Sequence, residues 1–498
     1  MKRREMIRRG LQVGAGGLLS GGLGTTALAA AGQKPAAGPG RAAHMDSGLL
    51  ARNIIFYAYD GFSWEDVAVG QAFARRRFGR PLRLDRLLKN GPAGSCETYS
   101  FDVVTDSAAA GTAWSTGRKT LNGLLNCYPD GEPLTPILEI ARGAGRATGL
   151  ITTTRVTHAT PAAWCARVLD RNEEDDIALQ YLAFRPDVLL GGGGRHFSPA
   201  TRSDGRDLAA EFSAAGHAVL RTSAALQRTN ASRLLGLFSG SHLPFEIDRR
   251  YQNARTPSLA ELAAKGLEVL AGYEHGFVAQ IEAGRIDHAN HHNDAGAAVW
   301  EVQAADDALG VVLDFVDRHP DTLLILASDH STGGGALHGT GSFYRDSSTA
   351  FERIDAHRGS LEHMIERLGS RPGADAVAEA VAAYAGCRLT PEQAALGARA
   401  FVEPAAASPN RTAFNDQPHN TLAYVIAGGG AGTAMRDRIN FNYATGQHTA
   451  AAVPVALYGA GAASRRFSFI DNTDLFGWMC DALGVRHENA VMEPAVPA

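Results

Sequence analysis

The feature that most constrains the fold is an alternation between short apolar runs and longer amphipathic segments. The first apolar run, Asn53–Tyr59, is followed at 63–76 by a segment in which Ser63 and Asp66 stand at the spacing of a helix cap. Strands that alternate with helices predict an α/β fold with a mostly parallel central sheet sandwiched by helices. Further runs expected to be strands lie at 148–153, 187–190, 277–281, 322–327, 421–427 and 453–458. Ligands are then expected at the carboxyl ends of the strands.

The length of the chain and the weakening of this pattern late in the sequence predict one large domain with an insert. A chain of 498 residues can form two or three ordinary domains, or one large α/β domain with insertions. After 342 the strand pattern gives way to helical stretches such as 351–368 and to a helix start at Thr390, Pro391 and Gln393. We therefore expect one domain over 51–498, with an inserted helical lobe at about 342–418.

Residues 1–31 have the composition of an export signal. A basic head with Arg3 and Arg4 precedes a Gly-rich, mildly apolar run and then small residues suited to cleavage. The pattern resembles a twin-arginine signal, and an ordinary signal peptide or a retained membrane anchor is the alternative. We expect residues 32–50 to form a flexible tail and the protein to be exported, to the periplasm or outside the cell.

Composition excludes several other classes of protein. Beyond the N-terminus no stretch offers the ~20 uninterrupted apolar residues that a spanning helix needs, so we expect no membrane span in the mature protein. The net charge of -4 gives no sign of a basic surface, so we expect no nucleic-acid-binding surface. The five cysteines are too few and too scattered for a disulfide scaffold or a CxxC zinc site, and buried thiols and disulfides both stay open.

Carboxylates and histidines recur where apolar strands stop. Asp60 follows the first strand, Glu282 ends FVAQIE, and Asp329 with His330 ends TLLILASDH. A single aspartate after a strand is ordinarily a turn or a helix cap. Because the carboxyl ends of parallel strands meet at one edge, three such cases together predict a shared site.

The segment after Glu282 offers two pairs of side chains at helical spacing. Asp287 and His291 are four residues apart, and His288 and His292 share that spacing, so either pair can face the site. A solvated or pH-sensitive helix face is the alternative. Aspartate, glutamate and histidine without thiolates suit zinc, and hard oxygen ligands beside them suit magnesium.

Ser107 follows Asp106 at the expected first turn of a helix of small residues. The free N–H groups and the dipole of such a helix would make an anion site, although a serine there is ordinarily only a cap. A nucleophilic serine needs a base or a metal. No G-x-S-x-G motif surrounds Ser107 and the neighbouring Asp106 is no histidine base, so activation by a metal is what remains.

Five separated blocks together resemble the alkaline phosphatase family. They are VTDSAAAGTAWSTG, TTTRVTHATPAAW, QIEAGRIDHANHH, ILASDHSTGG and GQHTAAAVPVALYG, in this order. The resemblance implies an alkaline phosphatase-like α/β domain with two zinc ions and one magnesium. It also implies hydrolysis of small phosphate monoesters to an alcohol and inorganic phosphate through a phosphoserine, and a homodimer is compatible with it.

The resemblance also implies roles for individual residues. Ser107 matches the nucleophile, and Arg171 matches the arginine that binds two phosphate oxygens. The implied metal ligands are Asp287, His291 and His448 for one zinc, Asp60, Asp329 and His330 for the second zinc, and Glu282 and Thr160 with the bridging Asp60 for magnesium. His158 and His288 occupy positions near these sites where members differ, and they predict an altered magnesium affinity and pH optimum.

Other activities compete with this interpretation. A phosphodiesterase or another hydrolase of the same superfamily would keep similar metal ligands, whereas a sulfatase would need C/S-x-P-x-R, which surrounds neither Ser107 nor any cysteine. A phosphate-binding or storage protein without turnover is a candidate of a different class. The role of the insert at 342–418 is open.

Overall fold

The computed structural model describes residues 50–252, 255–403, 418–428 and 439–492 of the chain. The expected signal at 1–31 and all but the last residue of the expected tail at 32–50 lie outside the described residues. Within them, no helix combines the length and the apolar character needed to cross a bilayer.

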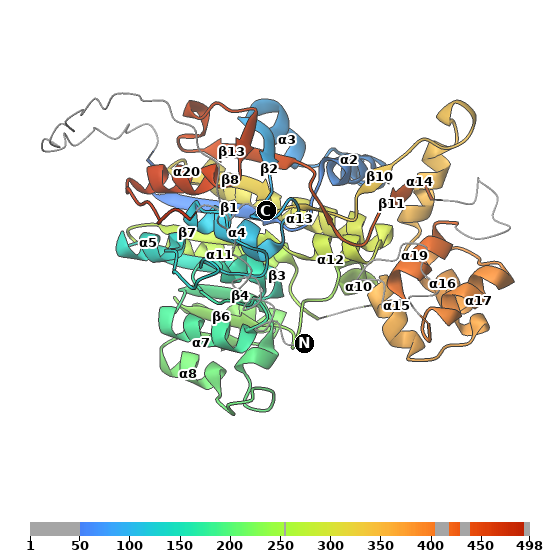
Figure 1. The fold of residues 1–498 in the computed structure, drawn as a ribbon, viewed down its shortest axis with the longest axis horizontal. Coiled ribbons are helices and arrows are strands. Elements are labelled where there is room, and N and C mark those ends of the chain that lie inside the picture. Colours follow the sequence, from blue (N-terminus) through green and yellow to red (C-terminus); the bar gives the residue numbers. More distant parts are fainter. Residues whose placement is uncertain (1–49, 253–254, 404–417, 429–438, 493–498) are drawn as a thin grey trace, which may run out of the picture. The chain divides into compact units, whose positions relative to one another are not determined.

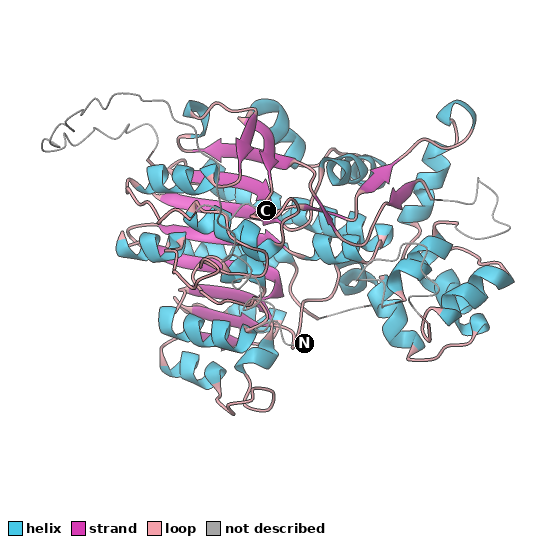
Figure 2. Cartoon of the chain, viewed as in Figure 1, coloured by secondary structure: helices cyan, strands magenta, loops and turns pink. Residues whose placement is uncertain are grey.

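A ten-stranded sheet organises the chain, with helices on both of its faces (Figures 1 and 2). The strand order is β14-β2-β13-β8-β1-β7-β3-β4-β6-β5, and every pairing in the sheet is parallel except those of β13. The strands are β1 (Asn53–Tyr59), β2 (Ala93–Glu97), β3 (Ala147–Arg155), β4 (Val188–Gly192), β5 (Ala218–Leu220), β6 (Leu234–Leu237), β7 (Phe277–Ala283), β8 (Thr322–Ser328), β13 (Val453–Gly459) and β14 (Phe469–Asp471). The predicted α/β class with a mostly parallel sheet is confirmed.

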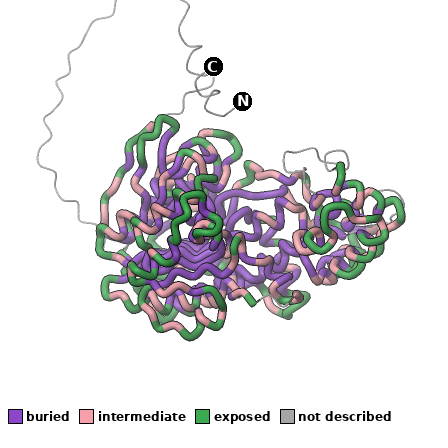
Figure 3. The backbone as a smooth tube through the Cα atoms, turned by 90° about the horizontal axis from the view of Figure 1, so that it is seen from below, coloured by how far each residue is buried: buried purple, intermediate pink, exposed green. Residues whose placement is uncertain are grey.

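Helices cover this sheet because its strands are apolar on both faces. In β1, Ile54 and Phe56 join one buried cluster, whereas Ile55 and Tyr57 join another. The residues coloured as buried therefore lie in the interior of the folded molecule, between its exposed edges (Figure 3). The described α-helices outside the insert are α2 (Trp64–Phe78), α3 (Leu84–Asn90), α4 (Ser107–Thr116), α5 (Ile137–Gly143), α6 (Ala159–Ala162), α7 (Glu174–Phe184), α8 (Leu208–Ala214), α9 (Ser223–Arg228), α10 (Glu246–Tyr251), α11 (Leu259–Ala271), α12 (Arg285–His291), α13 (Ala295–Arg318) and α20 (Asp474–Leu483).

Local signals place the helices that matter for the site. Ser63 and Asp66 form the predicted capping box of α2. Phe56 packs against Trp114 of α4 and against Trp164, with ring centroids 4.8 and 5.0 Å apart. Burial of these large rings fixes α4 against the sheet.

A helical region lies between two short strands that pair with each other, β10 (Gly335–Leu337) and β11 (Phe441–Tyr443). Its described helices are α14 (Ser347–Asp355), α15 (Leu361–Leu368), α16 (Ala374–Ala385), α17 (Pro391–Arg399) and α19 (His419–Ile426). Thr390 and Gln393 form the predicted capping box of α17. We call these five helices the helical insert. The limits 342–418 stay a prediction.

One predicted strand is wrong. The apolar run at 421–427 lies in helix α19, which ends at Ile426, and it packs with Met364 and Val377 in a small core of the helical insert. Leu422, Val425 and Ile426 have the i, i+3, i+4 spacing of one helix face. A short apolar run does not distinguish a strand from a buried helix, and only the neighbouring helices decide here.

Candidate active site

The parallel register brings acidic residues together at one edge of the sheet. Tyr59, the last residue of β1, stands opposite Ala283 of β7 and Ser328 of β8. Asp60 and Asp329 follow directly, and Glu282 is the residue before Ala283. The structure thus brings together the three strand ends that the sequence singled out, and all three carboxylates are buried.

His448 reaches the same edge because β13 runs against its neighbours. The residues before an antiparallel strand lie where its parallel neighbours end. His448 starts the short strand β12 (His448–Thr449), which pairs with β9 (Ser331–Thr332), directly after His330. This pairing bridges the long stretch of sequence between the two histidines.

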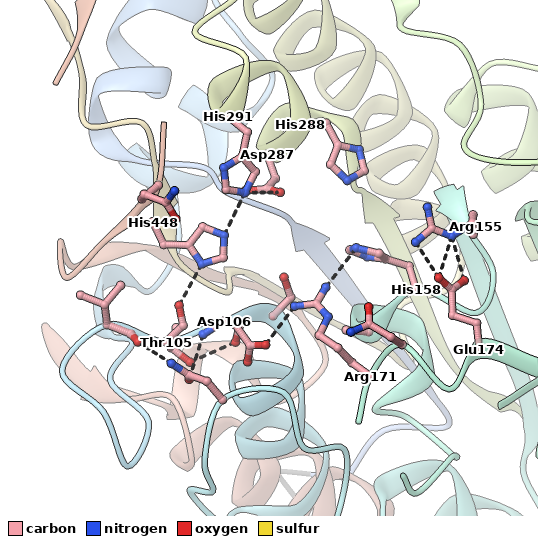
Figure 4. A pocket seen from close by; sticks show the side chains of 16 residues that line it. Thr105, Asp106, Arg155, His158, Arg171, Glu174, Asp287, His288, His291 and His448 are labelled. Carbon is pink, nitrogen blue, oxygen red and sulfur yellow. Dashed lines mark hydrogen bonds and ion pairs between the residues drawn. The ribbon is translucent and has the colours of Figure 1, made fainter. Parts of the chain in front are cut away.

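Asp287, His291 and His448 form a first cluster. The Nε2 atom of His291 lies 3.3 Å from Asp287 Oδ2, and that of His448 lies 3.6 Å from Asp287 Oδ1 and 3.1 Å from His291 Nε2 (Figure 4). Helix α12 therefore turns His291 to the site, while His292 stacks on His419 with ring centroids 3.8 Å apart. This resolves the choice that periodicity left open.

Backbone carbonyls orient both histidine rings of this cluster. His291 Nδ1 lies 2.7 Å from the carbonyl oxygen of Gly446, and His448 Nδ1 lies 2.9 Å from that of Thr105. A proton on each Nδ1 makes these hydrogen bonds and leaves each Nε2 as the ring atom that faces Asp287. Burial lowers the pKa of His448 to about 3. Burial alone would raise the pKa of Asp287, but the histidines beside it, His291 first, bring it well below its ordinary value.

Asp60, Asp329 and His330 form a second cluster next to Ser107. His330 Nε2 lies 3.1 Å from Asp329 Oδ2, 3.8 Å from Asp60 Oδ1 and 3.2 Å from Ser107 Oγ. Asp329 Oδ1 is held by the backbone N–H groups of Gly61 and His330. The serine hydroxyl therefore lies next to side-chain atoms that could hold a metal ion.

A third cluster shares Asp60. Thr160 Oγ1 donates to Asp60 Oδ2 at 3.3 Å, and Asp60, His158 and Glu282 offer ligand atoms within 4.8 Å of one another. His158 thus lies among the oxygen ligands. His288, by contrast, contacts Arg285 through Nδ1 at 2.9 Å and packs against His242.

Buried oxygens without partners show that these clusters fit metal ions. In the described residues, Asp60 Oδ1 and both carboxylate oxygens of Glu282 are buried and have no hydrogen-bond partner. Burial, together with the charge of Asp329, raises the pKa of both carboxyl groups. Buried carboxyl groups of this kind take up a proton or bind a cation, and divalent ions bound by oxygen and imidazole fit the second case.

Ser107 is the first residue of α4, and it does not cap the helix. The cap is Asp106, whose Oδ1 accepts the backbone N–H of Ala109 at 3.0 Å. The Ser107 hydroxyl is thus free of that role, and Ser107 lines a cavity of about 510 Å³. Arg171 and the first cluster line the same cavity (Figure 4). The small residues after Ser107 leave room for an anion at the helix start.

Arg171 is held over this cavity by two partners. Its Nη1 donates to Asp106 Oδ2 at 3.1 Å, and its Nη2 lies 3.1 Å from His158 Nε2. Burial, Arg171 and Arg155 lower the pKa of His158 to about 3, so the imidazole is neutral and accepts from Arg171. Although burial opposes it, the Arg171 charge lowers the pKa of Asp106. The ion pair therefore fixes the guanidinium beside Ser107.

Sequence reasoning missed several residues of this site. Arg155 lines the cavity and donates through Nε and Nη2 to both carboxylate oxygens of Glu174, at 2.7–3.0 Å. Thr332 donates to Asp287 Oδ1 at 2.5 Å. Glu174 belongs to an acidic run of the kind found at solvent-exposed helix starts, so its sequence context does not indicate a buried role. Its spacing from Arg155 also matches no local pattern of paired residues. His338 is exposed and contacts Asn442 away from the clusters.

The fold and the site together define a class of protein. Carboxylates and imidazoles gathered without thiolates suit divalent cations, and the serine and arginine beside them suit a phosphate ester. The chain therefore has the features of an enzyme that acts on phosphate esters and offers candidate sites for divalent metal ions on an α/β scaffold.

Comparison with known proteins narrows this class to one family. The family model described as alkaline phosphatase matches residues 51–485. Alkaline phosphatase 4 of Bacillus subtilis is 32% identical over 378 residues, which cover 74% of this chain and 75% of the relative. The crystal structure of Thermus thermophilus alkaline phosphatase is 47% identical, with a TM-score of 0.86, over 92% of this chain and 98% of that one.

A further relative is streptomycin-6-phosphate phosphatase of Streptomyces griseus. It is 34% identical over 56% of this chain and 73% of its own length. The chain belongs to the alkaline phosphatase family, and it is a phosphoric monoester hydrolase. The monoesterase interpretation fits these relatives better than the phosphodiesterase alternative.

Proposed function

We propose that the protein hydrolyses small phosphate monoesters through a phosphoserine on Ser107. The observation that carries this proposal is the position of the Ser107 hydroxyl, 3.2 Å from His330 Nε2 and in the same cavity as Arg171. Among the described residues, the side-chain contact of Ser107 Oγ is with a proposed metal ligand and not with a histidine free to act as a base.

Two zinc ions and one magnesium complete this proposal. Asp287, His291 and His448 would hold one zinc, Asp60, Asp329 and His330 the second, and Glu282, Thr160 and Asp60 the magnesium, with His158 next to it. When bound, these ions lower the pKa of the hydroxyl and water groups that they bind and offset the charge of the phosphoryl group. The buried oxygens of Asp60 and Glu282 that have no hydrogen bond among the described residues support this assignment.

Arg171 and the start of α4 hold the phosphoryl group in this scheme. The guanidinium can donate two parallel hydrogen bonds to phosphate oxygens, which a lysine cannot copy. Its contacts to Asp106 and His158 prepare that orientation before the substrate arrives. The N–H groups of the first turn of α4 add dipoles that favour the anion.

The proposed reaction has two balanced displacements. Ser107 Oγ forms a bond to phosphorus while the bond from phosphorus to the substrate oxygen breaks. The hydroxyl proton that Ser107 gives up balances the proton that the leaving oxygen takes, so the product is the alcohol. A water molecule then attacks the phosphoserine from the vacated side, which frees inorganic phosphate and restores the hydroxyl. Positioning and charge do most of the work in phosphoryl transfer, so we expect broad acceptance of monoesters.

Location, assembly and tuning are further parts of the proposal. The basic head and small-residue region at 1–31 support export, through the twin-arginine route, to the periplasm or beyond. A homodimer is proposed on the resemblance alone. His158 and His288 are proposed to tune magnesium affinity and pH optimum, and an unchanged magnesium dependence and pH profile in His158→Asp would reject this.

A serine replacement tests the nucleophile. Ser107→Ala should abolish monoester turnover and the acid-stable phosphoenzyme seen by mass spectrometry, while the zinc content stays as in the wild type. Ser115→Ala is a matched control, because it removes a buried hydroxyl from the same helix away from the cavity. Full turnover by Ser107→Ala would refute the assignment.

A further inference from the structure

Two asparagines link the helical insert to the segments that carry His291 and His448. Asn420 lies in α19 and is buried, and Asn293 lies just after α12. The amide nitrogen of Asn420 donates to the carbonyl oxygen of His291 at 3.0 Å and to Asn293 Oδ1 at 2.6 Å. A residue of the insert therefore holds the end of the helix that presents His291.

Asn293 extends this link to the segment before His448. Its backbone is left-handed, with φ at 56°, a conformation that asparagine tolerates better than most residues. From this position its amide nitrogen donates to the carbonyl oxygens of Asn290, at 3.0 Å, and Thr445, at 2.7 Å. One side chain thus ties the end of α12 to the loop that leads into His448.

Gly446 completes this set of contacts between the helical insert, α12 and the loop before His448. Its carbonyl oxygen is the partner of His291 Nδ1 and so orients that ring. A Cβ atom at Gly446 would lie 3.2 Å from Asn420 Nδ2 and 3.2 Å from the carbonyl oxygen of His291, so a larger residue here would have to push these close neighbours apart by a few tenths of an ångström. Two residues later the chain reaches His448, whose Nε2 faces that of His291 at 3.1 Å.

We propose that Asn420 and Asn293 form a positioning clamp, contributed in part by the helical insert, that sets the separation of His291 and His448. The affinity of the metal site that these histidines form then depends on the clamp. This inference rests on the proposed function, in which both histidines are zinc ligands. Groups that orient metal ligands change metal affinity by about 10- to 100-fold when they are removed.

The test measures zinc affinity in the holoenzyme by competition with a chelator. Asn420→Asp keeps the volume but loses the donor and turns oxygen toward two acceptors, and Asn293→Gly removes the side chain while allowing the left-handed backbone. Each variant should release zinc at a chelator concentration about tenfold lower than the wild type does. The double variant should release zinc at about the same chelator concentration as either single variant, because both substitutions break the same set of linked hydrogen bonds.

Two controls separate the clamp from other causes. Thr390→Ala removes the capping box of α17 in the same insert without touching the clamp, so its zinc release should match the wild type. His291→Ala should weaken zinc binding strongly, and no effect there would overturn the proposed metal site itself.

Three results would overturn the clamp. They are wild-type zinc release by a folded Asn420→Asp or Asn293→Gly protein, an equal shift in Thr390→Ala, and additive shifts in the double variant. Near-ultraviolet circular dichroism of each zinc-loaded variant checks folding. If Asn420→Asp does not fold, Asn293→Gly alone decides the matter by the same measurement.

Discussion

Asp106 joins the start of α4 to Arg171, and its replacement should separate stability from phosphate binding. Its Oδ1 caps the helix through Ala109, and its Oδ2 accepts Gly123 N at 2.9 Å and Arg171 Nη1 at 3.1 Å. Loss of the cap costs about 1 kcal/mol of unfolding free energy. Loss of the hydrogen bond from Gly123 costs about 1 kcal/mol more. Asp106→Ala should therefore lose about 2 kcal/mol.

Asp106→Asn should lose only about 1 kcal/mol, because its Oδ1 still caps α4 while its amide nitrogen cannot accept. Both variants leave Arg171 without its acidic partner. Ordering a freed arginine on binding costs about 0.5 to 1.5 kcal/mol. The inhibition constant of inorganic phosphate should rise about 2- to 10-fold in both.

Urea unfolding and competitive inhibition by phosphate measure the two effects of Asp106. Asp102→Asn, an exposed carboxylate on the same loop, is the control and should change neither quantity. Equal stability of the alanine and asparagine variants would refute the capping argument. A fall in the inhibition constant would show that the carboxylate repels phosphate more than it holds Arg171.

The remaining predictions concern pH and thiols. Burial would raise the pKa of Glu174, but hydrogen bonds from His196, Arg155 and Thr157 lower it well below its ordinary value. The stabilisation is then complete above the ordinary glutamate pKa of about 4.3 and is lost as the pH falls further. In urea unfolding, the deficit of Glu174→Gln should be full at pH 7 and shrink below about pH 4, and a constant deficit would contradict this. All five cysteines lie within the described residues as free thiols, and burial raises the pKa of Cys127 to about 11 and that of Cys480 to about 12. Iodoacetamide at pH 8 should leave the native thiols unlabelled and label all five after unfolding, as mass spectrometry can count; a missing label after unfolding would reveal a disulfide.

The sequence predicts the sheet well because strands buried on both faces are nearly continuous apolar runs. β1 and β8 match their predicted ranges closely for this reason. The run at 421–427 has the same composition, yet it is helix α19, because its neighbours are the helices of the insert and not a sheet. Local composition identifies an apolar run as a strand or a helix only where its neighbours in the fold allow just one of the two.

The residues of the candidate site also fall into those that the sequence predicts and those that it does not. Residues at strand ends, such as Asp60 and Glu282, were predictable because parallel strands end together. Periodicity could not choose between His291 and His292, since both have helical spacing. The family resemblance predicted His291, and the packing of α12 places that ring beside Asp287. Arg155, Glu174 and Asn420 act through contacts between distant segments, which leave no local pattern in the sequence.

The most direct test of the account combines metal analysis with monoester hydrolysis. The purified protein should contain about two zinc ions and one magnesium per chain and should hydrolyse 4-nitrophenyl phosphate. EDTA should remove the metals and the activity together, and zinc with magnesium should restore both. Full hydrolysis by the metal-free protein would contradict the central claim, as would a metal-loaded protein that binds phosphate but never releases alcohol from a monoester.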